Sequence, residues 1–377
     1  MSAGALPYTP AEVEELLAQL VSIDSVNPAL VPGGAGEAEI ARFVARWADE
    51  AGLDVEVVEP VAGRPSVVAT ARSAGGGRSL MLTAHLDTVG VAGMTAPHEP
   101  RVDDGRLYGR GSYDMKGGLA ACMLATAVAR RADLGGDVML AAVSDEEHSS
   151  IGVQAVVERF ETDACIVTEP TGLQVCVAHK GFAWWRITAH GRAAHGSRPD
   201  LGSDAIARMG PVLTRLVELD RSLEGRTHPL VGRASVHASL IEGGQELSSY
   251  PERCVLEVER RTLPGETAEA VGEELQLLLS DGMEGEVTLV RRPFEVGRDE
   301  PIVTTLRGRA AAVLGREPEI VGHTAWMDAA FTQDAGVPTV VFGPDGAGAH
   351  EVEEWVDLAS VEACARILVA TATKFSR

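Results

Sequence analysis

Short apolar runs separated by helical segments dominate the first half of the chain. The runs lie at 80–84, 138–143 and 164–168, and the helix predicted from Gly117 to about Arg130 is apolar on nearly every side. Strands that are continuous apolar runs have both faces covered, and strands that alternate with helices pair in parallel. The pattern therefore predicts an α/β fold with a mostly parallel sheet.

This pattern is interrupted between about residue 180 and residue 292. The extended segments there lie at 182–190, 234–241, 254–263 and 286–290, and the helical segments lie at 203–219 and 266–280. The order β-α-β-β-α-β is that of a ferredoxin-like domain. The α/β pattern then resumes to the end of the chain. We therefore expect a discontinuous first domain of residues 1–178 and 293–377, with residues 179–292 inserted as a second domain.

The composition excludes several classes of partner. The chain of 377 residues carries 33 basic and 55 acidic side chains, a formal net charge of −22. Nucleic acids and anionic membranes attract basic surfaces, so neither is expected as a partner. The five cysteines lack C-x-x-C spacing, which indicates free thiols in a reducing compartment. No signal peptide and no apolar run long enough to span a bilayer is evident, so we expect a cytoplasmic protein.

Polar side chains follow each predicted buried strand. His85 and Asp87 follow the first, Glu146 and Glu147 the second, and Glu169 the third. Carboxyl ends of parallel strands meet at one edge of a sheet, where binding sites form. Residues two apart on an extended segment face the same side, so the Asp87 carboxylate could orient the His85 imidazole. Such pairs also occur as plain structural hydrogen bonds, and alone this pair is weak evidence for a metal ligand.

Two further candidates complete this group. Asp114 lies immediately before the predicted helix at Gly117, and His350 follows a glycine-rich loop after a strand at 339–342. Two histidines and three carboxylates are too many ligands for one tetrahedral zinc ion, but they suit two ions that share a carboxylate. Glu146 and Glu147 point in opposite directions if extended, so one could bind metal while the other acts as general base. An isolated Glu-Glu pair would instead be typical of a solvated turn.

These segments resemble the dinuclear-zinc amidohydrolases and metallopeptidases that include acetylornithine deacetylase, succinyl-diaminopimelate desuccinylase, aminoacylase and carboxypeptidase G. The resemblance covers nearly the whole chain. The matching segments are His85-Leu86-Asp87-Thr88-Val89, residues 109–118 (GRGSYDMKGG), Asp145-Glu146-Glu147, Thr168-Glu169-Pro170, residues 191–197 (GRAAHGS) and the late His350.

The resemblance implies a ligand set for two divalent ions, zinc or alternatively cobalt or manganese. Asp114 would bridge the ions, His85 and Glu169 would hold one, and Glu147 and His350 would hold the other. It also implies a cis peptide bond after Asp114.

Catalytic roles are implied as well. Glu146 would be the general base that generates a metal-bound hydroxide, and Asp87 would orient His85. The inserted domain would be a dimerisation domain of a homodimer, whose His195 stabilises the oxyanion in the partner's active site. Arg261 would bind the substrate carboxylate.

Two segments depart from the family pattern. Ser248 replaces a usual asparagine, and residues 322–328 (GHTAWMD) replace a segment that often reads Gly-Thr-Asp. Both segments contribute to substrate recognition in the family, so they leave the substrate open. His323 and Trp326 could contact the substrate or simply pack in the interior.

The resulting hypothesis is a homodimeric amidohydrolase that cleaves the amide of an N-acyl amino acid. The alternative on the same scaffold is a carboxypeptidase or dipeptidase acting on short peptides. A catalytically silent relative that only binds ligands is a third hypothesis, against which the complete ligand set argues.

Overall fold

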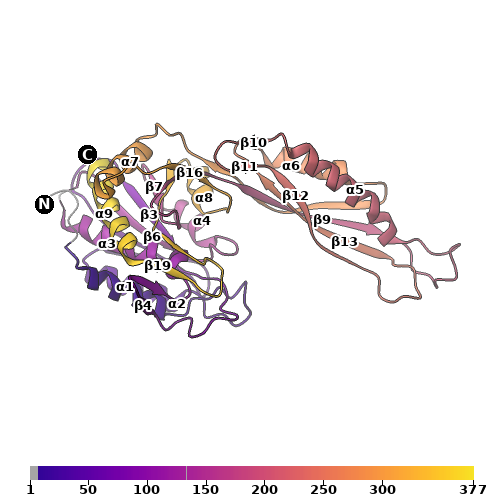
Figure 1. The fold of residues 1–377 in the computed structure, drawn as a ribbon, viewed down its shortest axis with the longest axis horizontal. Coiled ribbons are helices and arrows are strands. Elements are labelled where there is room, and N and C mark those ends of the chain that lie inside the picture. Colours follow the sequence, from indigo (N-terminus) through magenta and orange to yellow (C-terminus); the bar gives the residue numbers. More distant parts are fainter. Residues whose placement is uncertain (1–6, 133) are drawn as a thin grey trace. The chain divides into compact units, whose positions relative to one another are not determined.

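The computed structural model describes residues 7–132 and 134–377 (Figure 1). Its contacts divide the chain into two compact units. The first comprises the described residues up to Val177 together with Val296–Val321 and Met327–Arg377. The second comprises Ala178–Glu295 and Gly322–Trp326. The short segment 322–326 thus clusters with the second unit, which the sequence pattern did not indicate.

A nine-stranded sheet has the order β1-β2-β6-β3-β7-β17-β8-β15, with β16 pairing with β8. Its strands are β1 (Asp54–Val61), β2 (Arg64–Ala71), β3 (Leu80–His85), β6 (Val138–Val143), β7 (Cys165–Val167), β8 (Val175–His179), β15 (Phe294–Glu295), β16 (Ile320–His323) and β17 (Thr339–Val341). The neighbours β6, β3, β7 and β17 pair in parallel, whereas β1, β2, β8 and β15 join antiparallel. The α/β class is confirmed, but the sheet is mixed, with a parallel centre and antiparallel flanks. One flank is antiparallel because a tight turn, with Gly63 at φ 80°, joins β1 directly to β2.

Helices of the first unit pack against this sheet and against one another. They are α1 (Pro10–Ser22), α2 (Ala38–Glu50), α3 (Gly117–Arg131), α4 (Ile151–Val157), α7 (Pro301–Leu314), α8 (Ala329–Asp334) and α9 (Leu358–Phe375). Helix α3 is buried from Gly117 to Ala129 and packs beside α9, as Figure 1 shows. Its burial agrees with a sequence that is apolar on nearly every side.

A second, four-stranded sheet joins distant parts of the first unit. Its order is β18-β19-β5-β4, built from β4 (Arg101–Asp103), β5 (Arg106–Tyr108), β18 (Gly346–Ala347) and β19 (Trp355–Asp357). It joins β5, which lies shortly before Asp114 in the sequence, to β18 and β19, which lie on either side of His350 in the sequence. The sequence did not predict it, because strands this short carry no readable alternation.

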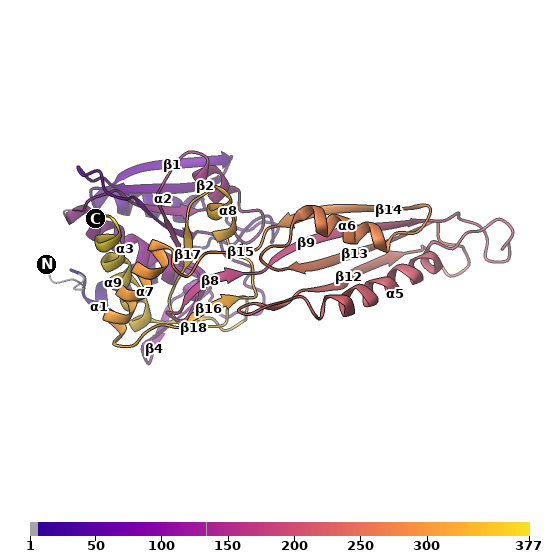
Figure 2. The same cartoon turned by 90° about the horizontal axis from the view of Figure 1, so that it is seen from above.

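The second unit has the expected order β9-α5-β12-β13-α6-β14. These elements are β9 (Gly181–His190), α5 (Ala205–Leu223), β12 (Ser235–Gly243), β13 (Arg253–Thr262), α6 (Ala268–Leu278) and β14 (Met283–Arg291), with a small ribbon of β10 (Thr227–His228) and β11 (Gly232–Arg233). The sheet order β12-β13-β9-β14 is antiparallel throughout. Helices α5 and α6 cover one face (Figure 2), where Trp185, Met209 and Leu275 share a core.

The five cysteines are buried free thiols, as expected. Within residues 7–132 and 134–377, the helices lack the combination of length and apolar character that crossing a membrane requires.

Candidate metal centre

Three neighbouring strands of the central sheet deliver three of the five candidate ligands. His85 is the last residue of β3, Glu169 lies two residues beyond β7, and Glu147 lies in the loop after β6. Strands β6, β3 and β7 are adjacent and parallel, so their carboxyl ends lie side by side. This is the edge of the sheet at which the sequence predicted a site.

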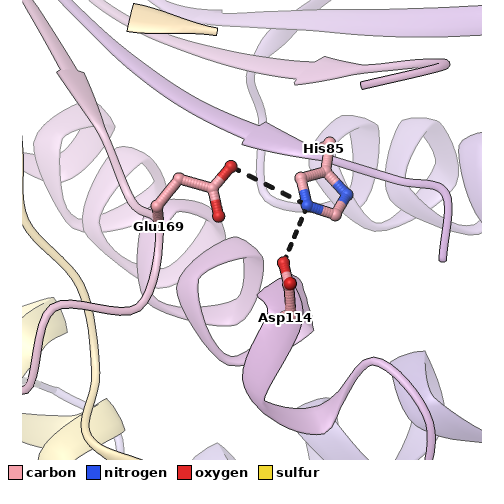
Figure 3. Close-up of side chains that lie close together, drawn as sticks. All are labelled: His85, Asp114 and Glu169. Atoms are coloured by element: carbon pink, nitrogen blue, oxygen red, sulfur yellow. Dashed lines mark hydrogen bonds and ion pairs between the residues drawn. The ribbon is translucent and has the colours of Figure 1, made fainter. Parts of the chain in front are cut away.

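The first group of ligands comprises His85, Asp114 and Glu169 (Figure 3). Nε2 of His85 lies 3.1 Å from Oδ1 of Asp114 and 3.8 Å from Oε1 of Glu169. His85 and Glu169 are buried, at 2% and 5% exposure. One imidazole nitrogen therefore faces two carboxylates from different elements.

The second group comprises Asp114, Glu147 and His350. Nε2 of His350 lies 3.4 Å from Oδ2 of Asp114 and 3.1 Å from Oε2 of Glu147. Within each group, the ligand atoms lie within 4.8 Å of one another. Asp114 belongs to both groups and presents a different carboxylate oxygen to each, the arrangement needed for a carboxylate shared by two ions.

The backbone around Asp114 has an unusual local form. The peptide bond between Asp114 and Met115 is cis, as the resemblance implied. It lies in the turn Ser112–Lys116 (η1), which follows Gly111 in a left-handed conformation and leads directly into α3.

The three carboxylates of this site outnumber its two histidines, so the side chains alone do not balance the negative charge. Burial and the nearby Asp114 carboxylate raise the pKa of Glu147, and burial raises the pKa of Glu169 well above its usual range. Hydrogen bonds with Asp114 and Glu147 raise the pKa of His350 to about 10. Carboxylates buried together favour bound protons when no other cation balances them.

The donor set fits two divalent cations. Oε1 of Glu147 is buried and has no hydrogen-bond partner in the described structure. A buried oxygen without a partner is energetically unfavourable, and a bound cation would remove that cost. Each group supplies imidazole nitrogen and carboxylate oxygen, which are ligands of zinc and similar ions. The described residues thus contain the complete ligand set predicted from the sequence, His85, Asp114, Glu147, Glu169 and His350, gathered into two groups.

The contacts of Asp87 differ from the sequence expectation. Nδ1 of His85 lies 2.9 Å from the main-chain oxygen of Asp87, whereas the nearer carboxylate oxygen is 3.8 Å away. The carboxylate instead accepts hydrogen bonds from the main-chain N–H groups of Glu146 and Glu147, both at 3.1 Å. Asp87 therefore contacts His85 through its backbone and the Glu146 loop through its side chain.

A buried polar network supports the same loop. Asn27 donates to Asp87 Oδ2 at 2.8 Å and to Asp145 Oδ1 at 3.0 Å. Arg64 donates to Asp145 at 2.8 Å and to both oxygens of Glu37 at 2.6 Å. Sequence reasoning missed Asn27, Arg64 and Glu37, because single polar residues in loops and at element ends form no pattern.

Glu146 lies beside the candidate metal groups. Burial raises its pKa well above the usual range, and the neighbouring carboxylates of Glu169 and Asp328 add to the effect. Among the described residues, no side chain donates a hydrogen bond to its carboxylate. Glu146 is partly buried and has the negative surroundings and the unengaged oxygens suited to a proton-transferring group.

The remaining predicted residues lie in the second unit. Nδ1 of His195 is 2.8 Å from the hydroxyl of Ser197, and Arg261 pairs with Glu259 at 2.8 Å while lying over the Phe182 ring. The roles of His195 and Arg261 stay predictions.

The two segments that depart from the family pattern have defined contacts. Ser248 accepts a hydrogen bond from the N–H of Gly196 at 2.6 Å. Trp326 donates to the main-chain oxygen of Arg292 at 3.0 Å and packs edge-on against Phe182. Trp326 therefore has at least a packing role within the second unit.

Comparison with known proteins identifies the family. An acetylornithine deacetylase of Aliivibrio salmonicida (strain LFI1238) is 28% identical over 374 residues, covering 95% of this chain and 97% of the relative. The aminopeptidase PepT from Bacillus cereus has a TM-score of 0.81 at 20% identity, covering 98% of this chain and 99% of that chain. The YXEP protein of Bacillus subtilis, described as a dinuclear metal-binding peptidase of the M20 family, has a TM-score of 0.72 at 17% identity, covering 97% and 98%. The model of peptidase family M20/M25/M40 matches residues 81–374, most of the chain, and the protein therefore belongs to this family.

Proposed function

We propose that the protein hydrolyses the amide bond of an N-acyl amino acid, as a deacylase related to acetylornithine deacetylase. The observation that carries the proposal is the shared Asp114 carboxylate, with one oxygen toward His85 and the other toward His350. Membership of a hydrolase family and the deacetylase relatives support amide hydrolysis. We expect one ion at His85, Asp114 and Glu169, and another at Asp114, Glu147 and His350.

When bound, two divalent ions would polarise the amide carbonyl and acidify the attacking water. Glu146 takes the proton from that water, since its carboxylate lies beside both groups and its pKa is raised by burial. It then returns the proton to the leaving amine, which cannot depart as an anion. The Asp87 carboxylate holds the main chain of Glu146 in place during both transfers.

The substrate and assembly are further parts of the proposal. Arg261 binds the substrate carboxylate, because a guanidinium fork matches a carboxylate and a chain of net charge −22 needs a local cation for an anionic ligand. His195 donates a hydrogen bond to the oxyanion of the partner subunit's substrate. The second unit is the dimerisation domain of a cytoplasmic homodimer, and the ions are zinc, cobalt or manganese.

Peptide hydrolysis is the second candidate function. The structural neighbours include an aminopeptidase and a metallo-carboxypeptidase from Sulfolobus solfataricus with a TM-score of 0.76. An amide between an acyl group and an amino acid has the same reacting atoms as a peptide bond, so the ligand groups and Glu146 would serve either reaction.

A substrate screen tests and separates these functions. The protein would be freed of metal, reloaded with Zn²⁺ or Co²⁺, and assayed with N-acetyl, N-succinyl and N-formyl amino acids and with dipeptides. We expect amine release from at least one acyl amino acid, only when metal is present. Faster cleavage of dipeptides would favour the peptidase, and metal-independent turnover would contradict the proposed use of the ligand groups.

A further inference from the structure

A buried carboxylate, Glu354, lies behind the candidate metal centre. Its exposure is 1%, and its Oε2 accepts hydrogen bonds from Arg110 Nη1 at 2.6 Å and from the Gly111 N–H at 2.9 Å. Its Oε1 accepts from the N–H groups of Tyr113 and Asp114, both at 3.0 Å. Both oxygens are thus fully used, and three of the four donors belong to the main chain leading to Asp114.

Glu354 lies four residues after His350, which is another ligand of the second group, and both residues belong to the same segment. This segment is tied to residues 109–114 by further bonds. The N–H of Gly109 donates to the main-chain oxygen of Glu354 at 3.1 Å, and Arg110 Nη2 donates to the oxygen of Glu351 at 2.9 Å. Five hydrogen bonds of Glu354 and one of Glu351 therefore join two segments that are far apart in sequence.

The His350 segment needs such support. His350 has φ 64°, in the left-handed region that costs a non-glycine residue about 1 kcal/mol or more. Its side chain is 56% exposed, so little packing holds the imidazole in place. The hydrogen bonds of Glu354, four residues later, anchor the segment that places His350 beside Asp114 and Glu147.

We propose that Glu354 is a positioning residue that sets the spacing between Asp114 and His350 and thereby the affinity and geometry of the metal pair. The inference rests on the proposed function, because it concerns the same two-ion site. Glu354 does not touch the ions. It acts through the main-chain N–H groups of Tyr113 and Asp114 and through its own chain connection to His350.

A carboxylate is required at this position for two reasons. All four groups that contact the Glu354 carboxylate are hydrogen-bond donors. The side-chain amide of a glutamine would point its own N–H groups at two of these donors, and those two hydrogen bonds would be lost. The negative charge also balances the buried guanidinium of Arg110, which is 3% exposed. Glu354→Gln therefore changes the hydrogen bonding while it keeps the size and shape of the side chain.

The test compares Glu354→Gln with Glu353→Gln in the full-length protein. Glu353 is the neighbouring residue, is exposed, and undergoes the same chemical change. Co²⁺ binding to the metal-free proteins would be followed by calorimetry, and the geometry at cobalt by its visible d–d spectrum. Losing a support of this kind commonly weakens metal binding by about 10- to 100-fold. We expect that loss and an altered spectrum for Glu354→Gln, and wild-type behaviour for Glu353→Gln.

The outcomes separate positioning from a merely structural role. A folded Glu354→Gln variant with a lower melting temperature but wild-type cobalt affinities and spectrum would overturn the inference. If that variant does not fold, Arg110→Gln replaces it, because it removes one donor to the carboxylate and the bond to the Glu351 oxygen between the same two segments, while the three main-chain donors remain. Unchanged cobalt affinity in Arg110→Gln would also overturn the inference. Wild-type protein that binds two ions but cleaves no acyl amino acid would contradict the proposed function alone.

Discussion

The Nδ1 atom of His85 lies 2.9 Å from the main-chain oxygen of Asp87. A carbonyl oxygen only accepts hydrogen bonds, so Nδ1 is the donor, and the lone pair of Nε2 would be available to a cation held together with Asp114 and Glu169. The backbone therefore fixes the tautomer required of a metal ligand. This leaves the Asp87 carboxylate available to hold the loop that carries Glu146.

Replacing Asp87 with alanine should separate these two functions. The main-chain oxygen remains, so we expect the variant to keep two ions per chain by elemental analysis. Turnover should fall by roughly 100-fold, a typical loss for a misplaced general base. The free energy of unfolding should fall by about 1–3 kcal/mol, since buried N–H groups lose their acceptor. Asp49→Ala, an exposed change on α2, is the control, and loss of an ion from Asp87→Ala would show that the carboxylate is needed to orient His85.

The shared carboxylate predicts unequal effects on metal content. Asp114→Ala removes a ligand from both groups and should lose both ions. His350→Ala leaves His85, Asp114 and Glu169 intact and should retain one ion. Metal per chain after gel filtration would be measured by elemental analysis, with the exposed His237→Ala as control. Equal loss from the Asp114 and His350 variants would contradict two separate groups.

The sequence predicted the ligands because it predicted where buried strands end. His85, Glu147 and Glu169 each follow an apolar run, and the order of such runs already implies a common edge of the sheet. Asn27 could not be found in the same way, since its importance comes from Asp87 and Asp145, which are 60 and 118 residues away. Glu354 lies near His350 in sequence, yet three of the four donors to its carboxylate are main-chain N–H groups that no residue pattern encodes.

The loop network makes Asn27 a second test of how Glu146 is held. Asn27→Ala leaves the buried carboxylates of Asp87 and Asp145 without a shared donor, which should cost about 1–3 kcal/mol of stability. We expect kcat to fall more than KM changes, since the network contacts the Glu146 loop rather than Arg261. Urea denaturation and steady-state kinetics would measure both effects. Gln19→Ala, on the surface of α1, controls for the substitution, and unchanged kcat would remove Asn27 from the positioning network.

Glu146 itself is expected to be essential for turnover but not for metal binding. Glu146→Gln keeps the size of the side chain and removes its ability to accept a proton. Losing a general base commonly costs about 100- to 10,000-fold in rate. Elemental analysis should still find two ions per chain. Glu158→Gln, an exposed change just after α4, is the matched control, and near-normal turnover of Glu146→Gln would reassign the base.

The second unit should lose stability in acid through the pair of Arg260 and Glu266. Burial alone would raise the pKa of Glu266, but hydrogen bonds from Arg260 at 2.7 Å and from the Leu263 N–H at 2.9 Å lower it below the usual 4.5. The ionised form is thus favoured in the folded state. Its contribution is fully present above pH 4.5 and disappears as the pH falls through the lowered folded value.

Glu266→Gln measures that contribution directly. At pH 7 the variant should be less stable than wild type by about 1–3 kcal/mol, the usual cost of weakening a charged hydrogen bond to a buried group. At acidic pH the difference should shrink, because wild-type Glu266 is then protonated as well. Urea unfolding of the full chain at pH 7 and at acidic pH, followed by Trp fluorescence, would show whether the stabilities of the variant and the wild type converge. Glu273→Gln, exposed on α6, should match wild type throughout. A difference that stays constant with pH would mean that Glu266 acts through packing and not through its charge.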